Sequence, residues 1–361
     1  MTPPPMGLII ELTHRCPLQC AYCSNPLQMD PPASELETDE WCRVLDEAAA
    51  LGVLQVHFSG GEPMARRDLE RLVAHASAGG LYTNIITSGV LLDGSRMAAL
   101  IEAGIDHVQL SFQDSEALPA DASGGYRGGH ARKLAAAALI RNSGLPLTTN
   151  FVVHRQNIDR VEEMLALGET LGSERMEIAH VQYYGWALRN RSALLPSIEQ
   201  LQRTTAIVGA ARVRLSGRIA IDYVVPDYYA ERPKACMGGW GQRFINISPS
   251  GKALPCHAAE TIPDMIFPSV RNWSLADLWN GAEAFARFRG TAWMPSPCHT
   301  CDRREIDWGG CRCQALALVG DATATDPACA RAPMHYLMAE AISEAGRTDE
   351  TIPRRFAKAL A

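Results

Sequence analysis

The chain has 361 residues, of which 47% are hydrophobic and 20% charged, a size and composition that predict one large globular domain and a smaller second one. Its formal net charge of −6 gives no basic footprint for nucleic acid. No apolar run approaches the roughly 18 to 20 residues of a membrane span, and the first residues, MTPPP, lack the basic start and apolar core of a signal peptide. We therefore expect a cytoplasmic protein.

The cysteines are numerous and unevenly distributed. Their number, eleven, is odd, which argues against a complete disulfide framework. Three lie near the N-terminus, seven lie in the last third, and only Cys42 stands alone, in a helical pattern. Because a cytosol keeps thiols reduced, tight groups of cysteines there are typically metal ligands.

The first predicted element is a strand over the apolar residues 7–10, and a cysteine loop follows it directly. Cys16, Cys20 and Cys23 have the spacing C-x3-C-x2-C. Short, uneven cysteine runs of this kind hold iron–sulfur clusters, and three ligands on a four-iron cube leave one iron open. A zinc knuckle is the alternative, but zinc ligands usually come as repeated pairs, and His14 is the only nearby histidine.

Strands and helices then alternate along the chain. Thr38 is a good N-cap for a helix that Gly52 ends, and a strand is expected over 53–58. Further helices are expected at 68–78, 95–103, 131–143, 159–171 and about 198–208, and further strands at 82–87, 107–112, 146–153 and 176–179. Six such units predict parallel βαβ connections in an open, partial barrel, over a first domain of residues 1–221. Loops at the carboxyl ends of the strands would form the site.

A glycine-rich turn follows the second predicted strand and should lie beside the cysteine loop. It reads Gly60-Gly61-Glu62-Pro63. Glycines let a ligand approach the backbone closely, and a carboxylate can accept hydrogen bonds from an ammonium group. Taken alone, this is equally a simple tight turn.

Weaker candidates lie at the same edge of the sheet. Ser111 ends the fourth strand and Asn150 lies within the fifth, where polar residues also serve as caps and turns. The aromatic stretch HVQYYGWAL, residues 180–188, either lines a substrate channel or packs at the domain junction.

From about residue 222 the pattern changes to short apolar pieces with prolines and cysteines, which predicts a second domain over 222–345. A β-hairpin is expected around residues 249–251, between Cys236 and Cys256. The remaining cysteines are Cys298, Cys301, Cys311, Cys313 and Cys329. One or two structural zinc sites would be the simplest interpretation. An amphipathic helix is expected at 334–345, and residues 346–361 form a loose tail or a partner contact.

The motif C-x3-C-x-Tyr-C, with Tyr22 before the third cysteine, followed one unit later by GGEP, resembles the radical S-adenosylmethionine (SAM) enzymes. The resemblance implies a [4Fe–4S] cluster whose open iron binds the amino and carboxylate groups of SAM, and reductive cleavage to a 5′-deoxyadenosyl radical. It also implies that Gly60, Gly61, Glu62 and Pro63 hold the methionine amino group, and that Ser111 and Asn150 contact the ribose or the carboxylate.

The second cysteine set resembles the SPASM domain of peptide-modifying radical SAM enzymes, whose central block reads C-x2-C-x5-C-x3-C. Here the third position is Asp307. The resemblance implies an outer [4Fe–4S] cluster on Cys298, Cys301, Asp307 and Cys329. It implies an inner [2Fe–2S] or [4Fe–4S] cluster on Cys236, Cys256, Cys311 and Cys313. Water, His299 or Glu305 could replace Asp307 as the fourth ligand, and His257 beside Cys256 raises a similar ambiguity.

Over essentially the whole chain, the sequence resembles the radical SAM/SPASM enzymes of pyrroloquinoline quinone (PQQ) biosynthesis. That resemblance implies a carbon–carbon cross-link between a glutamate and a tyrosine of the precursor peptide PqqA. It also implies delivery by the chaperone PqqD and an electron donor such as flavodoxin. Another SPASM peptide maturase, thioether-forming or sulfatase-maturating, and a non-catalytic iron–sulfur scaffold are the alternatives. No acid–base residue can be named from the sequence.

Overall fold

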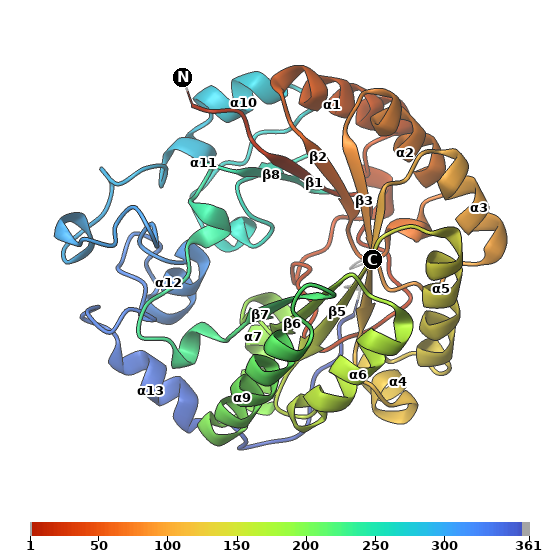
Figure 1. Cartoon of the computed structure of the whole chain (residues 1–361). Helices are drawn as coiled ribbons and strands as arrows, with labels where there is room; N and C mark the ends of the chain where they lie inside the picture. Colours follow the sequence, from red (N-terminus) through yellow and green to blue (C-terminus); the bar gives the residue numbers. More distant parts are fainter. Residues whose placement is uncertain (1, 356–361) are drawn as a thin grey trace, which may run out of the picture.

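A nine-stranded sheet organises the computed structural model, which describes residues 2–355 (Figure 1). The strands are β1 (Gly7–Glu11), β2 (Gln55–Ser59), β3 (Tyr82–Thr87), β4 (His107–Phe112), β5 (Leu147–Val153), β6 (Arg175–His180), β7 (Ala220–Val224), β8 (Phe244–Ile247) and β9 (Ala253–Leu254). They lie in the order β7-β6-β5-β4-β3-β2-β1-β8-β9. All neighbours pair in parallel except β8 and β9, which pair antiparallel.

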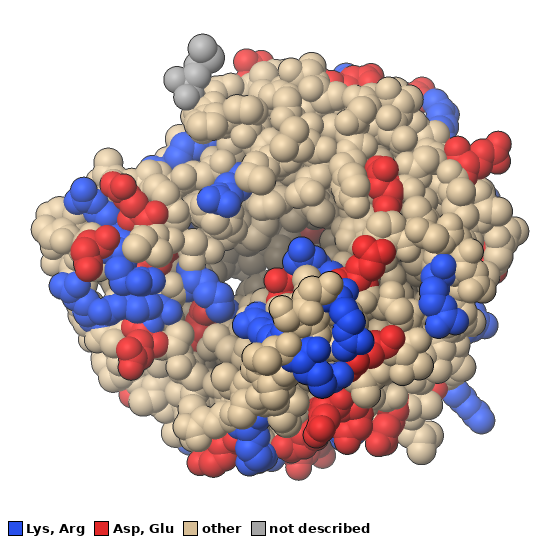
Figure 2. Space-filling model, in the orientation of Figure 1, with Lys and Arg blue, Asp and Glu red and all other residues tan. Residues whose placement is uncertain are grey.

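The helices α1 (Thr38–Leu51), α2 (Leu69–Ala78), α3 (Gly94–Glu102), α5 (Gly129–Ser143), α6 (Val161–Leu171) and α9 (Ile198–Arg214) cover the outer face of this sheet. The shorter helices α4 (Ala117–Gly124), α7 (Gly185–Arg189) and α8 (Arg191–Leu194) lie in the connections after β4 and β6, and α7 and α8 pack with the C-terminal part. The C-terminal part adds α10 (Leu275–Gly281), α11 (Glu283–Ala286), α12 (Arg312–Val319) and α13 (Tyr336–Ser343). Figure 1 shows an open barrel whose gap is faced by the C-terminal part, and the space-filling view is hollowed between the two (Figure 2).

The six expected strand–helix units are all present, and the α/β partial barrel predicted from the sequence is confirmed. The sheet is nevertheless wider than expected. The short strand β7 adds a seventh parallel strand across the predicted domain boundary. The expected hairpin is formed by β8 and β9, but β8 also joins the main sheet, with Phe244 opposite Gly7. No local sequence pattern predicts the pairing of β8 with β1, because it joins segments more than 200 residues apart. The division into two domains near residue 221 stays a proposal.

The start of α1 differs by one residue from its prediction. Glu37, not Thr38, is the N-cap, and its side chain and that of Glu40 cap each other's backbone N–H groups in a capping box. Thr38 is instead the first helical residue, and its hydroxyl donates to Asp68 Oδ2 at 2.7 Å. Gly52 ends the helix as expected, with a left-handed φ of +90°.

The two faces of the strands differ in polarity. Outward-facing side chains such as Val56, Phe58 and Leu110 are fully buried under the helices. Alternate residues point into the barrel and are polar, and they hydrogen-bond across strands, as Asn84 does with His57 at 2.9 Å. The period of two in a strand therefore gives an apolar shell around a polar interior.

The C-terminal segment is exposed over residues 346–350 and is anchored to the protein near Ile352 and Arg354. Ile352 N donates to Asn190 Oδ1 at 2.7 Å, and Arg354 is only 3% exposed. Residues 356–361 of the predicted tail lie outside the described residues. Within residues 2–355, no helix is long and apolar enough to cross a membrane.

The buried histidine of the barrel interior predicts a pH dependence of stability. Burial, followed by the nearby His107, lowers the pKa of His57 from 6.5 to about 4. The unfolded chain therefore takes up this proton at a higher pH than the folded chain. The stabilisation is complete above pH 6.5 and is lost as the pH falls toward 4, at up to about 1.4 kcal/mol per pH unit. His57→Gln should flatten this part of the profile of unfolding temperature against pH.

The matched control is His75→Gln, on the outer helix α2, where the imidazole pairs with Asp46. If the unfolding temperature falls equally steeply between pH 6.5 and 4 in His57→Gln and in the wild-type protein, His57 is not the group responsible for this pH dependence.

Candidate active site and cluster-binding residues

A cavity of about 300 Å³ lies at the carboxyl ends of the parallel strands. Successive strands each contribute to its wall, which is lined among others by Cys16, Cys20, Cys23, Gly60, Gly61, Thr87, Ser88, Ser111, Asn150, His180, Gln182, Tyr184 and Arg354. The structure thus brings together the three N-terminal cysteines, both glycines of the turn, and the two weaker candidates on β4 and β5.

Glu62 and Pro63, the other two residues of the turn, do not line this cavity. Glu62 is fully buried, and its carboxylate accepts hydrogen bonds from Thr87 Oγ1 at 2.7 Å and Ser88 N at 2.8 Å. It also accepts from Met64 N at 3.1 Å. The carboxylate therefore ties the turn after β2 to the end of β3.

The two glycines are required by the close approach of the cysteine loop. Gly60 has a φ of +132°, and a Cβ there would lie 2.4 Å from Thr13 O. A Cβ on Gly61 would lie 2.5 Å from the carbonyl oxygen of His14. The backbones hydrogen-bond at this contact, Gly61 N to Thr13 O at 2.6 Å and Glu62 N to Arg15 O at 2.8 Å. The turn and the cysteine loop therefore form one unit.

Burial dominates the titration of the N-terminal cysteines. It raises the pKa of Cys16 to about 12 and that of Cys23 to about 11. Metals bind thiolates, so a bound metal would have to stabilise the charged form against this burial. Burial also lowers the pKa of Lys133 to about 8, and its ammonium donates to Ser111 O at 2.6 Å, beside the cavity.

Four further cysteines form a closed group in the C-terminal part. The thiol of Cys236 lies within hydrogen-bonding reach of Cys256 and Cys311, and that of Cys313 lies within reach of the same two. All but Cys311 are less than 10% exposed. These are the four residues expected to hold an inner cluster.

Tyr184 joins this inner cysteine group to the cavity. It lines the cavity and packs against the cluster of buried residues that contains Cys236 and Cys256. Its hydroxyl makes a short hydrogen bond with His257 Nε2, and the two rings meet edge to face at 5.1 Å. Of the aromatic stretch, His180 and Tyr184 line the cavity, whereas Tyr183 and Trp186 are buried in packing contacts.

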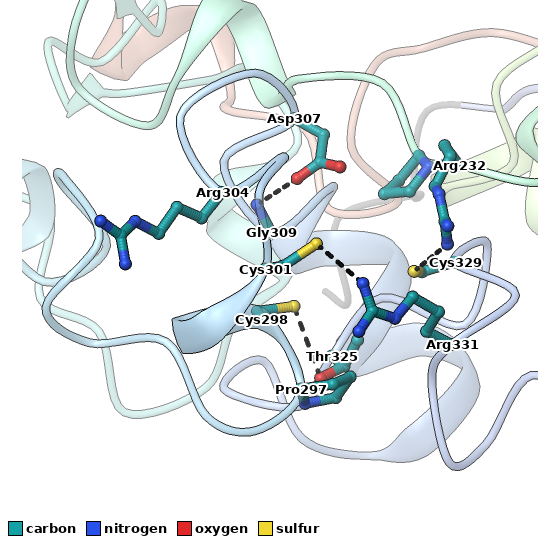
Figure 3. Close-up of a pocket in the computed structure, with 11 residues that line it drawn as sticks. Arg232, Pro297, Cys298, Cys301, Arg304, Asp307, Gly309, Thr325, Cys329 and Arg331 are labelled. Atoms are coloured by element: carbon teal, nitrogen blue, oxygen red, sulfur yellow. Dashed lines mark hydrogen bonds between the residues drawn. The ribbon is translucent and has the colours of Figure 1, made fainter.

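The outer cysteines converge with Asp307 on a second, smaller pocket (Figure 3). Cys298, Cys301, Asp307 and Cys329 all line it, and Asp307 is 8% exposed. The alternative donors His299 and Glu305 do not line the pocket and are exposed. The geometry therefore favours Asp307 as the fourth donor.

Arginines that the sequence did not single out surround the outer group. Arg331 Nη1 lies 3.5 Å from Cys301 Sγ, and Arg232 Nη1 lies 3.5 Å from Cys329 Sγ. Arg304 lines the same pocket. The positive charge of these arginines would offset the negative charge of cysteine thiolates that bind a cluster here.

Among the described residues, no three His, Cys, Asp or Glu side chains are grouped as a site for a single metal ion. In an iron–sulfur cluster, iron and sulfide atoms separate the thiolates.

Comparison with known proteins places this geometry in a family. Residues 10–168 match the radical SAM superfamily, and residues 236–302 match the SPASM iron–sulfur cluster-binding domain. A relative from Granulibacter bethesdensis, named PqqA peptide cyclase, is 64% identical over 95% of this chain and 92% of its own length. A relative of the same name from Rhodopseudomonas palustris is 60% identical over 98% and 94%.

Solved structures show the same fold at low identity. Streptococcus suis SuiB bound to S-adenosylmethionine has a TM-score of 0.74 and 20% identity, covering 92% of this chain and 77% of that one. The enzyme anSMEcpe with bound AdoMet and the Kp18Cys peptide has a TM-score of 0.67 and 15% identity, covering 94% and 97%.

The fold and the cysteine sites thus define a radical SAM enzyme with a SPASM domain, a class that uses SAM and iron–sulfur clusters. Within that class, the chain belongs to the PqqA peptide cyclases, the PqqE enzymes of PQQ biosynthesis. The family membership predicted from the sequence is confirmed, and a non-catalytic iron–sulfur scaffold protein is excluded.

The contact between turn and loop predicts a selective effect on the N-terminal cluster. Gly61→Ala should displace the cysteine loop, because its Cβ would overlap the carbonyl oxygens of Arg15 and His14. We expect a loss of stability of about 1 to 3 kcal/mol and less iron and sulfide per chain after anaerobic reconstitution. Gly94→Ala, where a Cβ meets nothing within 4 Å, is the control. Equal iron content in the two variants would contradict the proposed constraint.

Proposed function

We propose that this enzyme forms a carbon–carbon bond between a glutamate and a tyrosine side chain of the precursor peptide PqqA, in PQQ biosynthesis. One observation carries the proposal: in a chain 64% identical to a PqqA peptide cyclase, the three N-terminal cysteines and the glycine turn meet in one cavity. A thioether-forming or sulfatase-maturating SPASM enzyme is the less favoured alternative, because neither the close relatives nor the aspartate at 307 supports it.

The cavity residues fit a SAM-binding role. Cys16, Cys20 and Cys23 would hold a [4Fe–4S] cluster, which together with SAM supplies a 5′-deoxyadenosyl radical. The turn lies beside the three cysteines, and Gly60 and Gly61 line the same cavity. Glu62 and Pro63 support this turn from behind. Asn150 Oδ1 is a buried acceptor without a partner in the described residues, which a bound molecule would satisfy.

The other two cysteine groups would hold auxiliary clusters. We assign Cys236, Cys256, Cys311 and Cys313 to an inner [2Fe–2S] or [4Fe–4S] cluster. Cys298, Cys301, Asp307 and Cys329 are assigned to an outer [4Fe–4S] cluster. Residues 1–221 would form the radical SAM domain, residues 222–345 the SPASM domain and residues 346–361 a terminal segment.

Family membership supports PqqA as the substrate. The peptide would enter the cavity near Tyr184, and Ser111, which lines the same cavity, would contact SAM. The chaperone PqqD and an electron donor such as flavodoxin would act with the enzyme in the cytoplasm.

An anaerobic assay tests the reaction. Reconstituted enzyme with SAM, a reductant, PqqA and PqqD should yield 5′-deoxyadenosine and a peptide lighter by two hydrogens, with the cross-link between Glu and Tyr in tandem mass spectra. Deoxyadenosine with an unchanged PqqA, and with a competing SPASM substrate modified instead, would favour the alternative maturase.

The aspartate in the outer group can be tested by spectroscopy. Carboxylate oxygen is a harder and less covalent donor than thiolate, so Asp307→Cys should change the electron paramagnetic resonance spectrum and the midpoint potential of one cluster. Glu305→Ala, at an exposed alternative donor, should change neither. Identical spectra and potentials in Asp307→Cys and the wild-type enzyme would show that Asp307 is not a ligand.

A further inference from the structure

One row of inward-facing side chains runs across the strands beneath the cavity. Strand register places Ser111 beside Asn150, Asn150 beside Glu177, and Glu177 beside Asp222. Ser111 and Asn150 line the main cavity, whereas Glu177 lines a separate cavity of about 620 Å³ at the opposite ends of the strands. The hydrogen-bonded side chains of Asn150 and Glu177 thus lie between the two cavities.

Two amides converge on a single oxygen of Glu177. Asn150 Nδ2 lies 2.8 Å from Glu177 Oε2, and Gln109 Nε2 lies 3.0 Å from the same oxygen. Burial and the charge of Asp222 raise the pKa of Glu177, while Arg175 and the two amide donors favour the charged form. Both amides turn their NH₂ groups toward Oε2, which accepts a hydrogen bond from each of them.

This arrangement fixes the polarity of Asn150. With one N–H of its NH₂ group donated to Glu177, the orientation of the amide is fixed, and Oδ1 is the atom that has no protein partner among the residues that the structure describes. Oδ1 is buried and has no partner in the described residues, although buried polar atoms are nearly always hydrogen-bonded. A molecule in the cavity would therefore have to bring a donor to this point, and a carboxylate cannot do so.

We infer that Glu177 is a positioning residue that fixes Asn150 as a hydrogen-bond acceptor for a ribose hydroxyl of SAM. The inference rests on the proposed function, in which SAM occupies the cavity. For Oδ1 it favours the ribose over the methionine carboxylate, the two contacts that the sequence left open for Asn150, since a carboxylate offers only acceptors.

The test measures binding of SAM and of its 2′-deoxy and 3′-deoxy analogues to reconstituted enzyme by anaerobic calorimetry. Asn150→Ala and Glu177→Ala should each weaken SAM binding about tenfold, the size of one hydrogen bond. The double variant should be no weaker than Asn150→Ala alone. The analogue that lacks the hydroxyl contacted by Asn150 should bind the wild-type enzyme about tenfold more weakly than SAM does. Asn150→Ala and Glu177→Ala should weaken the binding of that analogue almost no further.

Controls separate positioning from a general structural effect. His107→Ala removes another polar group of the barrel interior, which contacts Thr148 and not Asn150, and should leave SAM affinity unchanged. Glu177→Gln keeps an acceptor oxygen and should retain most of the affinity. Glu177→Met keeps the side-chain length and serves if the alanine variant does not fold.

The outcomes distinguish this inference from the proposed function. SAM binding to Glu177→Ala at wild-type strength, while Asn150→Ala binds weakly, would overturn the positioning role and leave the SAM site intact. An equal loss for SAM and both analogues would also overturn it, as a structural effect. Failure of the fully iron-loaded wild-type enzyme to bind SAM would overturn the proposed function itself.

Discussion

The backbone contact between the turn after β2 and the cysteine loop is the constraint on which the site depends. Gly61 N and Glu62 N donate to the carbonyl oxygens of Thr13 and Arg15 in that loop. The approach is so close that neither glycine leaves room for a Cβ. Behind the turn, the buried carboxylate of Glu62 binds the end of β3. Three consecutive strand ends are thereby locked together, and the cysteines of the loop are held at the rim of the cavity.

The C-terminal segment holds the same loop from the other side. The guanidinium of Arg354 donates to Leu18 O at 3.3 Å and, at shorter range, to the carbonyl oxygen of His14. Asn190 bridges the loop and the segment, since its amide donates to Ala21 O and Ile352 O, each at 2.9 Å. Residues more than 300 positions apart therefore enclose the cysteine loop, and they bring positive charge to buried thiols.

Much of this arrangement could be predicted from local patterns. The strands at 82–87 and 107–112 have the predicted bounds, because their apolar alternation and flanking turns are strong signals. The cysteines also lie in three separate groups, near the three expected sets, and their binding of clusters stays a prediction.

What the sequence did not reveal depends on contacts between distant segments. No local sequence pattern predicts the pairing of β8 with β1. The same holds for the contacts of Arg232 and Arg331 with cysteine sulfurs and for the burial of Arg354. The hydrogen bonds of the Glu62 carboxylate to Thr87 and Ser88 join the ends of β2 and β3, and no local pattern indicates them. Likewise, the role proposed for Glu177 depends on its position beside Asn150 on the neighbouring strand, which the sequence alone does not show.

We propose that the three N-terminal cysteines hold the SAM-cleaving cluster, and that the other two cysteine groups hold the auxiliary clusters. The most direct measurement compares the wild-type enzyme with the variant Cys16→Ala/Cys20→Ala/Cys23→Ala after anaerobic reconstitution, by Mössbauer spectroscopy and by deoxyadenosine formation with SAM and a reductant. We predict that the variant retains the auxiliary cluster signals and forms no deoxyadenosine. Deoxyadenosine at the wild-type rate would contradict the account.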